Sequence, residues 1–154
     1  MVDFFNSLTR EQLMKLFVFI VFCILLLFTS CTKETKKLEA FNAEAFAYDL
    51  GNSWEVDGTV RVKGFRQNEK NNKFTATLSY EIDLVKPPGD TLRALISKTE
   101  DKVNDEEFMD VPIEVQFDLD STYSDGDYEL IFNIKDAGTG KTASASASFN
   151  LKKD

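Results

Sequence analysis

The densest group of side chains that could do chemistry is a set of four aspartates around one predicted turn. Asp118, Asp120, Asp125 and Asp127 fall within the ten-residue stretch DLDSTYSDGD. Hard cations such as calcium bind several oxygen ligands at about 2.3–2.6 Å, so a calcium site is one interpretation. The glycine and the closing glutamate of an EF-hand loop do not stand at the required positions. We therefore expect a solvated turn, with a calcium site as the alternative.

A second group is the pair Glu81 and Asp83, which stand two residues apart. Two carboxyl groups on one strand face resemble the acid and base of a glycoside hydrolase. One carboxyl group of such a pair must be buried, because burial raises its pKa, and nothing in the surrounding sequence indicates burial. We therefore do not expect this pair to be catalytic.

The residue types that the chain lacks exclude most other chemistry. The sequence has no histidine, and its two cysteines are Cys23 and Cys31. This leaves no Ser-His-Asp or Cys-His machinery and almost no zinc, copper or haem site. The net charge of −8 argues against binding nucleic acid, which depends on clustered Lys and Arg. We expect no enzyme activity, no cofactor, no metal and no nucleic-acid partner.

Cys31 is the one residue to which a specific chemical role can be assigned. It ends the stretch MKLFVFIVFCILLLFTSC, residues 14–31, in which Lys15 precedes 13 apolar residues, 16–28. A basic start, a short apolar core and small residues before a break are typical of a secretory signal peptide. As a helix the apolar run would be roughly 20 Å long, short of the about 20 residues that span a bilayer. An uncleaved N-terminal anchor is the weaker alternative.

Because the break falls at a cysteine, the stretch resembles the signal of a bacterial lipoprotein. Phe28, Thr29, Ser30 and Cys31 occupy the four lipobox positions, with Phe28 where the family prefers Leu or another aliphatic residue. The resemblance implies cleavage before Cys31, lipid such as palmitate on that cysteine, and a membrane anchor in the cell envelope, at the outer membrane or cell surface. The expected parts are a signal peptide at 1–30, a tether at 31–40 and a folded domain at 41–154. Translation starts at Met1 or at Met14; the sequence leaves both open.

The folded domain has the alternation of apolar and polar residues that predicts antiparallel strands. The pattern is strict at 54–63 and 74–84, where one face is apolar and the other polar. Gly58 within the first run predicts a bulge. Residues 38–50 are ambiguous between helix and strand; we favour a strand near 45–50, in which Phe46, Tyr48 and Leu50 alternate. The other expected strands are 91–97, 113–119, 128–134 and 143–151.

The segments between these strands are rich in turn residues and charges. A polar hairpin loop is expected at 66–73, a turn at 86–90 and a long charged loop at 98–110. About seven short strands without a convincing long helix predict an all-β antiparallel sandwich, preceded by the N-terminal signal or anchor helix.

The C-terminal third, GDYELIFNIKDAGTGKTASASASFNL, residues 126–151, resembles the last two strands of bacterial immunoglobulin-like and fibronectin-type-III-like domains. The resemblance implies an immunoglobulin-like sandwich. It also implies that Tyr128 forms a tyrosine corner, with its hydroxyl group bound to the preceding turn. Such sandwiches carry many unrelated functions, so the resemblance assigns a fold and almost no activity.

Two further sets of residues are candidates for binding. Glu106, Glu107, Phe108 and Met109 form an acidic stretch with an apolar tip that could contact a basic partner; the competing interpretation is a solvated loop with Phe108 at the edge of the core. Three aromatic residues, Trp54, Tyr80 and Tyr128, could line a ligand site, but we expect them in the core.

The sequence therefore favours a non-enzymatic, membrane-anchored lipoprotein that contacts an unidentified protein partner. The alternative is an inhibitor or small-ligand binder that uses loops at the end of the sandwich. That alternative predicts a concave patch formed jointly by residues 86–90 and 98–110.

Overall fold

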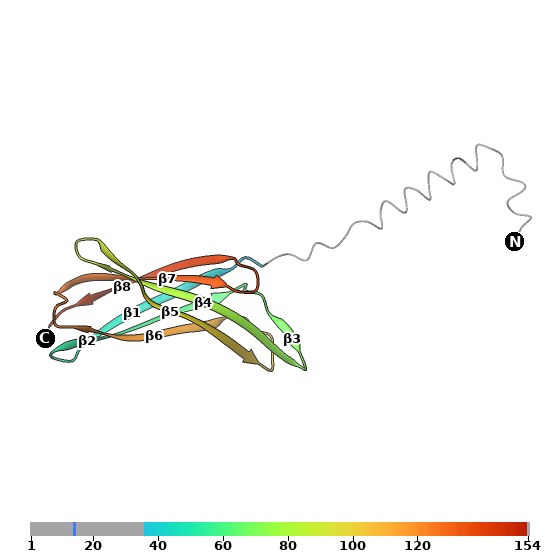
Figure 1. Ribbon diagram of the computed structural model, residues 1–154, viewed down its shortest axis with the longest axis horizontal. Coiled ribbons are helices and arrows are strands. Elements are labelled where there is room, and N and C mark those ends of the chain that lie inside the picture. The colour runs from blue at the N-terminus through green and yellow to red at the C-terminus, as the bar shows by residue number, and fades with distance from the viewer. Residues whose placement is uncertain (1–13, 15–35, 154) are drawn as a thin grey trace, which may run out of the picture. The chain divides into compact units, whose positions relative to one another are not determined.

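The computed structural model describes Met14 and residues 36–153 of the chain. Residues 36–153 form eight β-strands in two antiparallel sheets that pack against each other as a sandwich (Figure 1). The strands are β1 (Glu39–Asp49), β2 (Ser53–Lys63), β3 (Asn68–Lys70), β4 (Lys73–Lys86), β5 (Asp90–Asn104), β6 (Val111–Asp120), β7 (Gly126–Asp136) and β8 (Thr142–Leu151). The predicted N-terminal helix lies outside the described residues. Among the residues that are described, no helix is long and apolar enough to cross a membrane.

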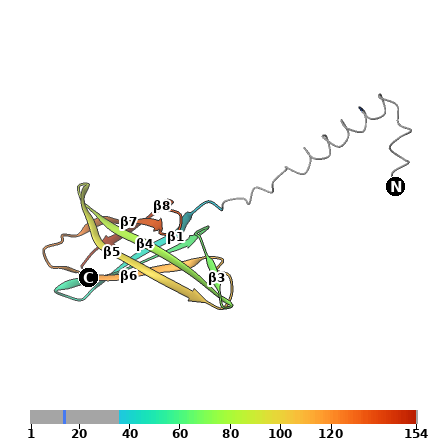
Figure 2. The same cartoon turned by 45° about the vertical axis from the view of Figure 1, so that its right-hand side comes forward.

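The two sheets differ in size and in the strands at their edges. The three-stranded sheet has the order β1-β2-β6. The five-stranded sheet has the order β3-β4-β7-β8, and β5 pairs with the other edge of β4 (Figure 2). Although β1 and β8 belong to different sheets, they contact each other along one side of the sandwich.

The core consists of the inward side chains of the central strands. In β2 the residues that alternate inward are Trp54, Val56, Val60 and Val62, all with at most 2% of their surface exposed. In β4 the inward set is Ala76, Leu78, Tyr80, Ile82 and Leu84. The alternation predicted at 54–63 and 74–84 is therefore confirmed except at Asp83, and the core position of Trp54, Tyr80 and Tyr128 is confirmed as well.

The bulge predicted at Gly58 is wrong. Gly58 pairs in regular register with Ala45 on one side and Val115 on the other. A Cβ atom at this position would lie 2.8 Å from Leu130 Cδ1 and 3.1 Å from Phe132 Cζ of the opposite sheet. The glycine is thus required for close packing between the sheets and not for a change of register.

The first strand is longer than predicted, and its large apolar side chains point to solvent. It spans Glu39–Asp49, with an irregular register between Phe41 and Glu44 where Asn42 has a φ of 49°. The alternating residues Phe46 and Tyr48 point to solvent, and the alanines between them pack against the core.

Two segments predicted to be loops contain strands. Residues 66–73 include β3, which turns into β4 through Asn71 and Asn72, both with positive φ as a two-residue hairpin of type I′ requires. The charged segment 98–110 is strand as far as Asn104, because β5 pairs with β4 along almost its whole length. As an edge strand, β5 has few buried side chains, so its sequence is as polar as that of a loop.

The loops gather at two ends of the domain. The Lys36 end holds the starts of β1 and β8 and the loops 64–67, 104–110 and 136–142; contacts from Lys36 to Glu107 and from Lys141 to Lys36 join them. The far end holds the turns 49–53, 86–90 and 120–126 and the end of β8. The start of β1 and the end of β8 thus lie at opposite ends of the domain (Figure 1).

A buried carboxylate holds the Lys36 end together. Asp136, 1% exposed, accepts hydrogen bonds from the backbone N–H groups of Arg66 and Gly138, both 2.9 Å, and from Thr139 Oγ1, 2.6 Å. It therefore ties the loop after β2 to the turn between β7 and β8, and these loops belong to different sheets.

At the far end, Tyr128 forms the tyrosine corner that the sequence predicts. Its hydroxyl group donates to the carbonyl oxygen of Ser124 at 2.9 Å, and its ring stacks on Phe149 with 5.6 Å between centroids. The bond fixes the turn before β7 to the strand itself.

Replacing Asp136 by Ala should lower the free energy of unfolding by about 3 kcal/mol, because buried donors lose a charged acceptor. Urea denaturation followed by the fluorescence of Trp54 measures the change. Asp125→Ala, which removes an exposed carboxylate at the far end, is the matched control and should change stability by less than about 0.5 kcal/mol. Equal effects of the two substitutions would contradict the structural role of Asp136.

The tyrosine corner predicts a smaller effect. Tyr128→Phe should cost about 1 kcal/mol, since it removes one hydrogen bond and keeps the stacked ring. The same denaturation measurement tests this, and Tyr48→Phe, at an exposed tyrosine, should have no measurable effect. A Tyr128→Phe variant as stable as the parent would show that the bond to Ser124 contributes nothing.

Candidate interaction faces

The sequence-predicted sites fall in three different settings. Cys31 lies outside the described residues. The predicted loop 106–109 is at the Lys36 end, and the four aspartates of the predicted turn are at the far end.

In the loop 106–109, Phe108 belongs to the edge of the core. Its ring packs edge-on against Phe65, with 6.1 Å between centroids, and its backbone N–H and C=O both bind the Gln67 side chain, at 2.8 and 2.7 Å. Glu107 forms an exposed ion pair with Lys36 at 3.2 Å. The apolar tip is thereby reduced to Met109, which is 91% exposed, beside Glu106.

The four aspartates at the far end act within the turn and the strands. Asp120 binds the backbone N–H of Thr122 at 2.8 Å and also its hydroxyl group, and these bonds lower the pKa of Asp120. Asp127 accepts from Asn150 Nδ2 at 2.8 Å. In residues 36–153, no group of three or more Asp, Glu, His or Cys side chains is placed to hold a metal ion.

Asp83 was expected on the solvent face with Glu81, and this is wrong. It is 7% exposed and accepts hydrogen bonds from the backbone N–H of Ala94 at 2.7 Å and from Asn133 Nδ2 at 3.0 Å. Ala94 has a φ of 50° at an irregularity in the β4–β5 pairing, and the carboxylate satisfies the N–H that this irregularity frees. Asp83 is therefore a structural group.

The joint concave patch predicted from 86–90 and 98–110 does not form. The turn 86–90 is at the far end and residues 104–110 are at the Lys36 end, separated by the length of the β4–β5 hairpin. Each lines a separate small hollow with its own neighbours.

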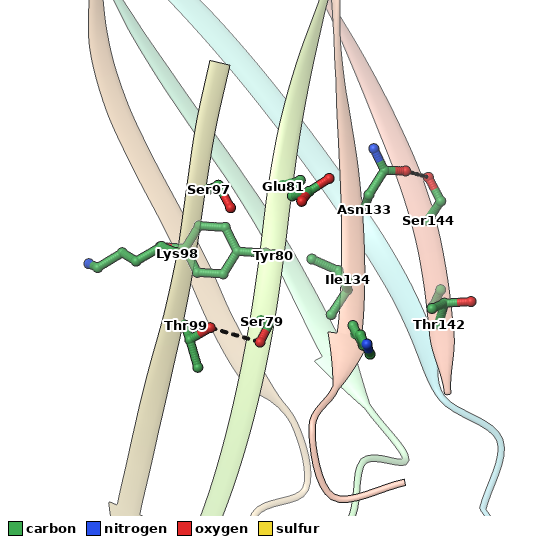
Figure 3. A pocket seen from close by; sticks show the side chains of 12 residues that line it. Ser79, Tyr80, Glu81, Ser97, Lys98, Thr99, Asn133, Ile134, Thr142 and Ser144 are labelled. Atoms are coloured by element: carbon green, nitrogen blue, oxygen red, sulfur yellow. Dashed lines mark hydrogen bonds between the residues drawn. The ribbon is translucent and has the colours of Figure 1, made fainter. Parts of the chain in front are cut away.

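The outer face of the five-stranded sheet carries short polar side chains in register. A hollow of about 530 Å³ lies in this face, and Figure 3 shows the side chains that line it. Ser79 is bound to Thr99 at 2.8 Å and Ser144 to Asn133 at 3.2 Å. These hydroxyl and amide groups largely satisfy one another across neighbouring strands. The face is a hydrogen-bonded polar surface with Glu81 near its centre.

Glu100 of the edge strand β5 pairs with the inward Leu78 of β4 and therefore lies on the core side of this sheet. Its carboxylate accepts from Tyr80 Oη at 2.9 Å and pairs with Lys98 at 2.7 Å and Lys102 at 2.6 Å. Hydrogen bonds from Lys102 and Lys98 lower the pKa of Glu100 to about 2. Burial, together with the bond to Glu100, raises the pKa of Tyr80 to about 12.

The outer face of the three-stranded sheet has a different character, which the sequence interpretation missed. Phe46 and Tyr48 of β1 and Leu50 just after it are 53%, 51% and 57% exposed. We call these three residues, two of which are aromatic, the aromatic stripe. They occupy successive outward positions. The alternation was visible in the sequence, but a run of alanines alternating with large apolar residues does not say which set faces the core.

Acidic side chains lie beside the aromatic stripe on the neighbouring strands. Phe46 pairs with Asp57 of β2, and Tyr48 pairs with Glu55, which in turn pairs with Asp118 of β6. A hollow of about 410 Å³ lies between Phe46 and the β6 segment 114–116. The acidic row consists of Glu44, Glu55, Asp57, Glu114 and Asp118, none of which forms an ion pair within residues 36–153.

Comparison with known proteins gives no sequence match and a distant structural likeness. No family model matches the chain, and no curated protein matches it. Among solved structures, the N-terminal domain of PorA is similar with a TM-score of 0.39 and 8% sequence identity, covering 75% of this chain and 98% of that one.

The contacts of Glu100 predict a specific pH dependence. Its folded-state pKa of about 2 lies below the ordinary 4.5, so its stabilisation is complete above pH 4.5 and is lost as the pH falls toward 2. The difference in unfolding free energy between the parent and Glu100→Gln should therefore be constant near neutral pH and narrow between pH 4.5 and 2. Urea titrations at several pH values measure this difference, and one that stayed constant down to pH 2 would contradict the assignment.

Proposed function

We propose that this protein is a bacterial lipoprotein, anchored in the cell envelope by lipid on Cys31, that acts without catalysis by binding another protein. The observation that carries the proposal is the stretch 14–31, which combines Lys15, an apolar run and small residues before Cys31. The outer membrane or the cell surface is the favoured location.

The distance from Cys31 to the folded domain supports this arrangement. Five residue steps separate Cys31 from Lys36, and an extended chain covers at most about 18 Å in that distance. Lys36 is bound by Glu107 and Lys141 of the folded domain. The Lys36 end would therefore lie next to the bilayer, and the two outer sheet faces would remain open to partners.

We also propose that the sandwich is immunoglobulin-like. The order β1-β2-β6 corresponds to strands A-B-E of that fold, and β4-β7-β8 corresponds to C-F-G, with β5 in the place of the strand that variable-type domains add beside C. The bond from Tyr128 to Ser124 occupies the position of the tyrosine corner.

The roles of the charged groups favour binding over catalysis. The buried carboxylates Asp83 and Asp136 and the ion-paired Glu100 are each engaged by several donors that hold the fold. The aromatic stripe, in contrast, is an exposed apolar surface, and contiguous exposed apolar surface commonly marks an interaction site.

Lipidation is tested by Cys31→Ala in the full chain, expressed in a bacterial host that processes lipoproteins. The parent should incorporate labelled palmitate and partition into the detergent phase of a cloud-point separation, whereas the variant should lose the label and move to the aqueous phase. Cys23→Ala, at the chain's other cysteine, is the matched control and should behave as the parent does. A Cys31→Ala variant that still partitioned with detergent would favour the uncleaved anchor.

A further inference from the structure

We infer that the aromatic stripe and the acidic row together bind an extended segment of a partner protein in which basic and apolar side chains alternate. The inference rests on the proposed role in protein binding but not on the lipid anchor. It names the chemistry of the partner and the face that the partner occupies.

The geometry of β1 suits an extended segment. Outward side chains on one strand recur about every 6.6–6.8 Å, so Phe46, Tyr48 and Leu50 span roughly 13 Å. An extended partner strand has the same repeat and could place successive side chains on one face against successive members of the stripe. Phe and Tyr rings give large contact area at little cost in conformational entropy.

The charge of the face selects a basic partner. Five carboxylates of the acidic row lie around the stripe, and none of them forms an ion pair within residues 36–153. An acidic or neutral partner would leave those charges unpaired at the interface, whereas Lys or Arg would pair with them and lie over the rings.

The chain itself contains one example of this mode of binding, at the other end of β1. There Lys63 lies over the Phe41 ring, with Nζ 4.6 Å from the centroid, and pairs with Glu39 at 3.3 Å. A ring and a carboxylate on the same face thus hold a lysine. Phe46 beside Asp57 and Tyr48 beside Glu55 repeat the ring and the carboxylate without the lysine. The partner would supply the missing cations.

The test uses the full chain, reconstituted in nanodiscs of phosphatidylcholine, and three fluorescent heptapeptide probes. The probes are lysine alternating with leucine, lysine alternating with serine, and glutamate alternating with leucine. Fluorescence anisotropy measures binding. The lysine–leucine probe should bind most tightly, and binding should weaken as salt rises from 50 to 500 mM because exposed charges are screened.

Variants locate the binding on this face. The double variant Phe46→Ser/Tyr48→Ser should weaken binding of the lysine–leucine probe about tenfold, through loss of two ring contacts. Glu55→Gln/Asp57→Asn should weaken it and flatten its salt dependence. The matched controls are Met109→Ser, at an exposed apolar side chain elsewhere, and Asp125→Asn/Asp127→Asn, at acidic groups of the far end; both should bind as the parent does.

Three results would overturn the inference. In the first, the lysine–serine probe binds as tightly as the lysine–leucine probe, which would show charge attraction alone. In the second, the glutamate–leucine probe binds as tightly as the lysine–leucine probe. In the third, Phe46→Ser/Tyr48→Ser leaves binding of the lysine–leucine probe unchanged. Displacement of the lysine–leucine probe by a neutral polysaccharide would also overturn it, by assigning the face to carbohydrate. A protein that is labelled with palmitate at Cys31 but does not bind the lysine–leucine probe would refute this inference alone. A protein that binds the probe but is not labelled would refute the lipid anchor alone.

Discussion

The distance between the two sheets is the constraint on which most of this structure depends. Face-to-face sheets usually lie about 10 Å apart, and they come closer only where inward side chains are small. Here Gly58 faces Leu130 and Phe132, and alanines fill the inward positions along most of β1 and in the first part of β8, which closes the sandwich along that side. Because neighbouring residues of a strand point to opposite faces, the same requirement turns Phe46 and Tyr48 of β1 toward solvent. The aromatic stripe is thus a geometric consequence of how the core closes.

The polar groups that hold the domain together work at its two ends. Asp136 gathers donors from loops of both sheets at the Lys36 end, and Tyr128 binds its own turn at the far end. Asp83 accepts a hydrogen bond from the backbone N–H of Ala94, where the pairing of β4 and β5 is irregular. Buried polar groups of this kind are costly when they lose a partner, so these side chains have little freedom to serve in chemistry.

Sequence patterns predicted the central strands because those strands have one buried face and one solvent face. The runs containing Trp54, Leu78 and Phe132 alternate cleanly for this reason. Prediction failed at the edges. The second half of β5 has few buried side chains, so its sequence resembles a charged loop. In β1 the alternation of alanines with large apolar residues does not show which set is buried. The role of Gly58 depends on the opposite sheet, which the local sequence does not describe. The chemistry expected of Cys31 rests on the sequence alone.

The direction of the strands has a mechanical consequence. The chain enters at the Lys36 end through β1 and reaches the far end through β8, and the two strands run in the same direction side by side. A pull between the start of β1 and the end of β8 therefore acts along these two strands and shears their ladders with β2 and β7. In shear, the hydrogen bonds of a ladder resist the load together, whereas in peeling they break one at a time. A load applied between these two ends would thus be carried by strand ladders in shear.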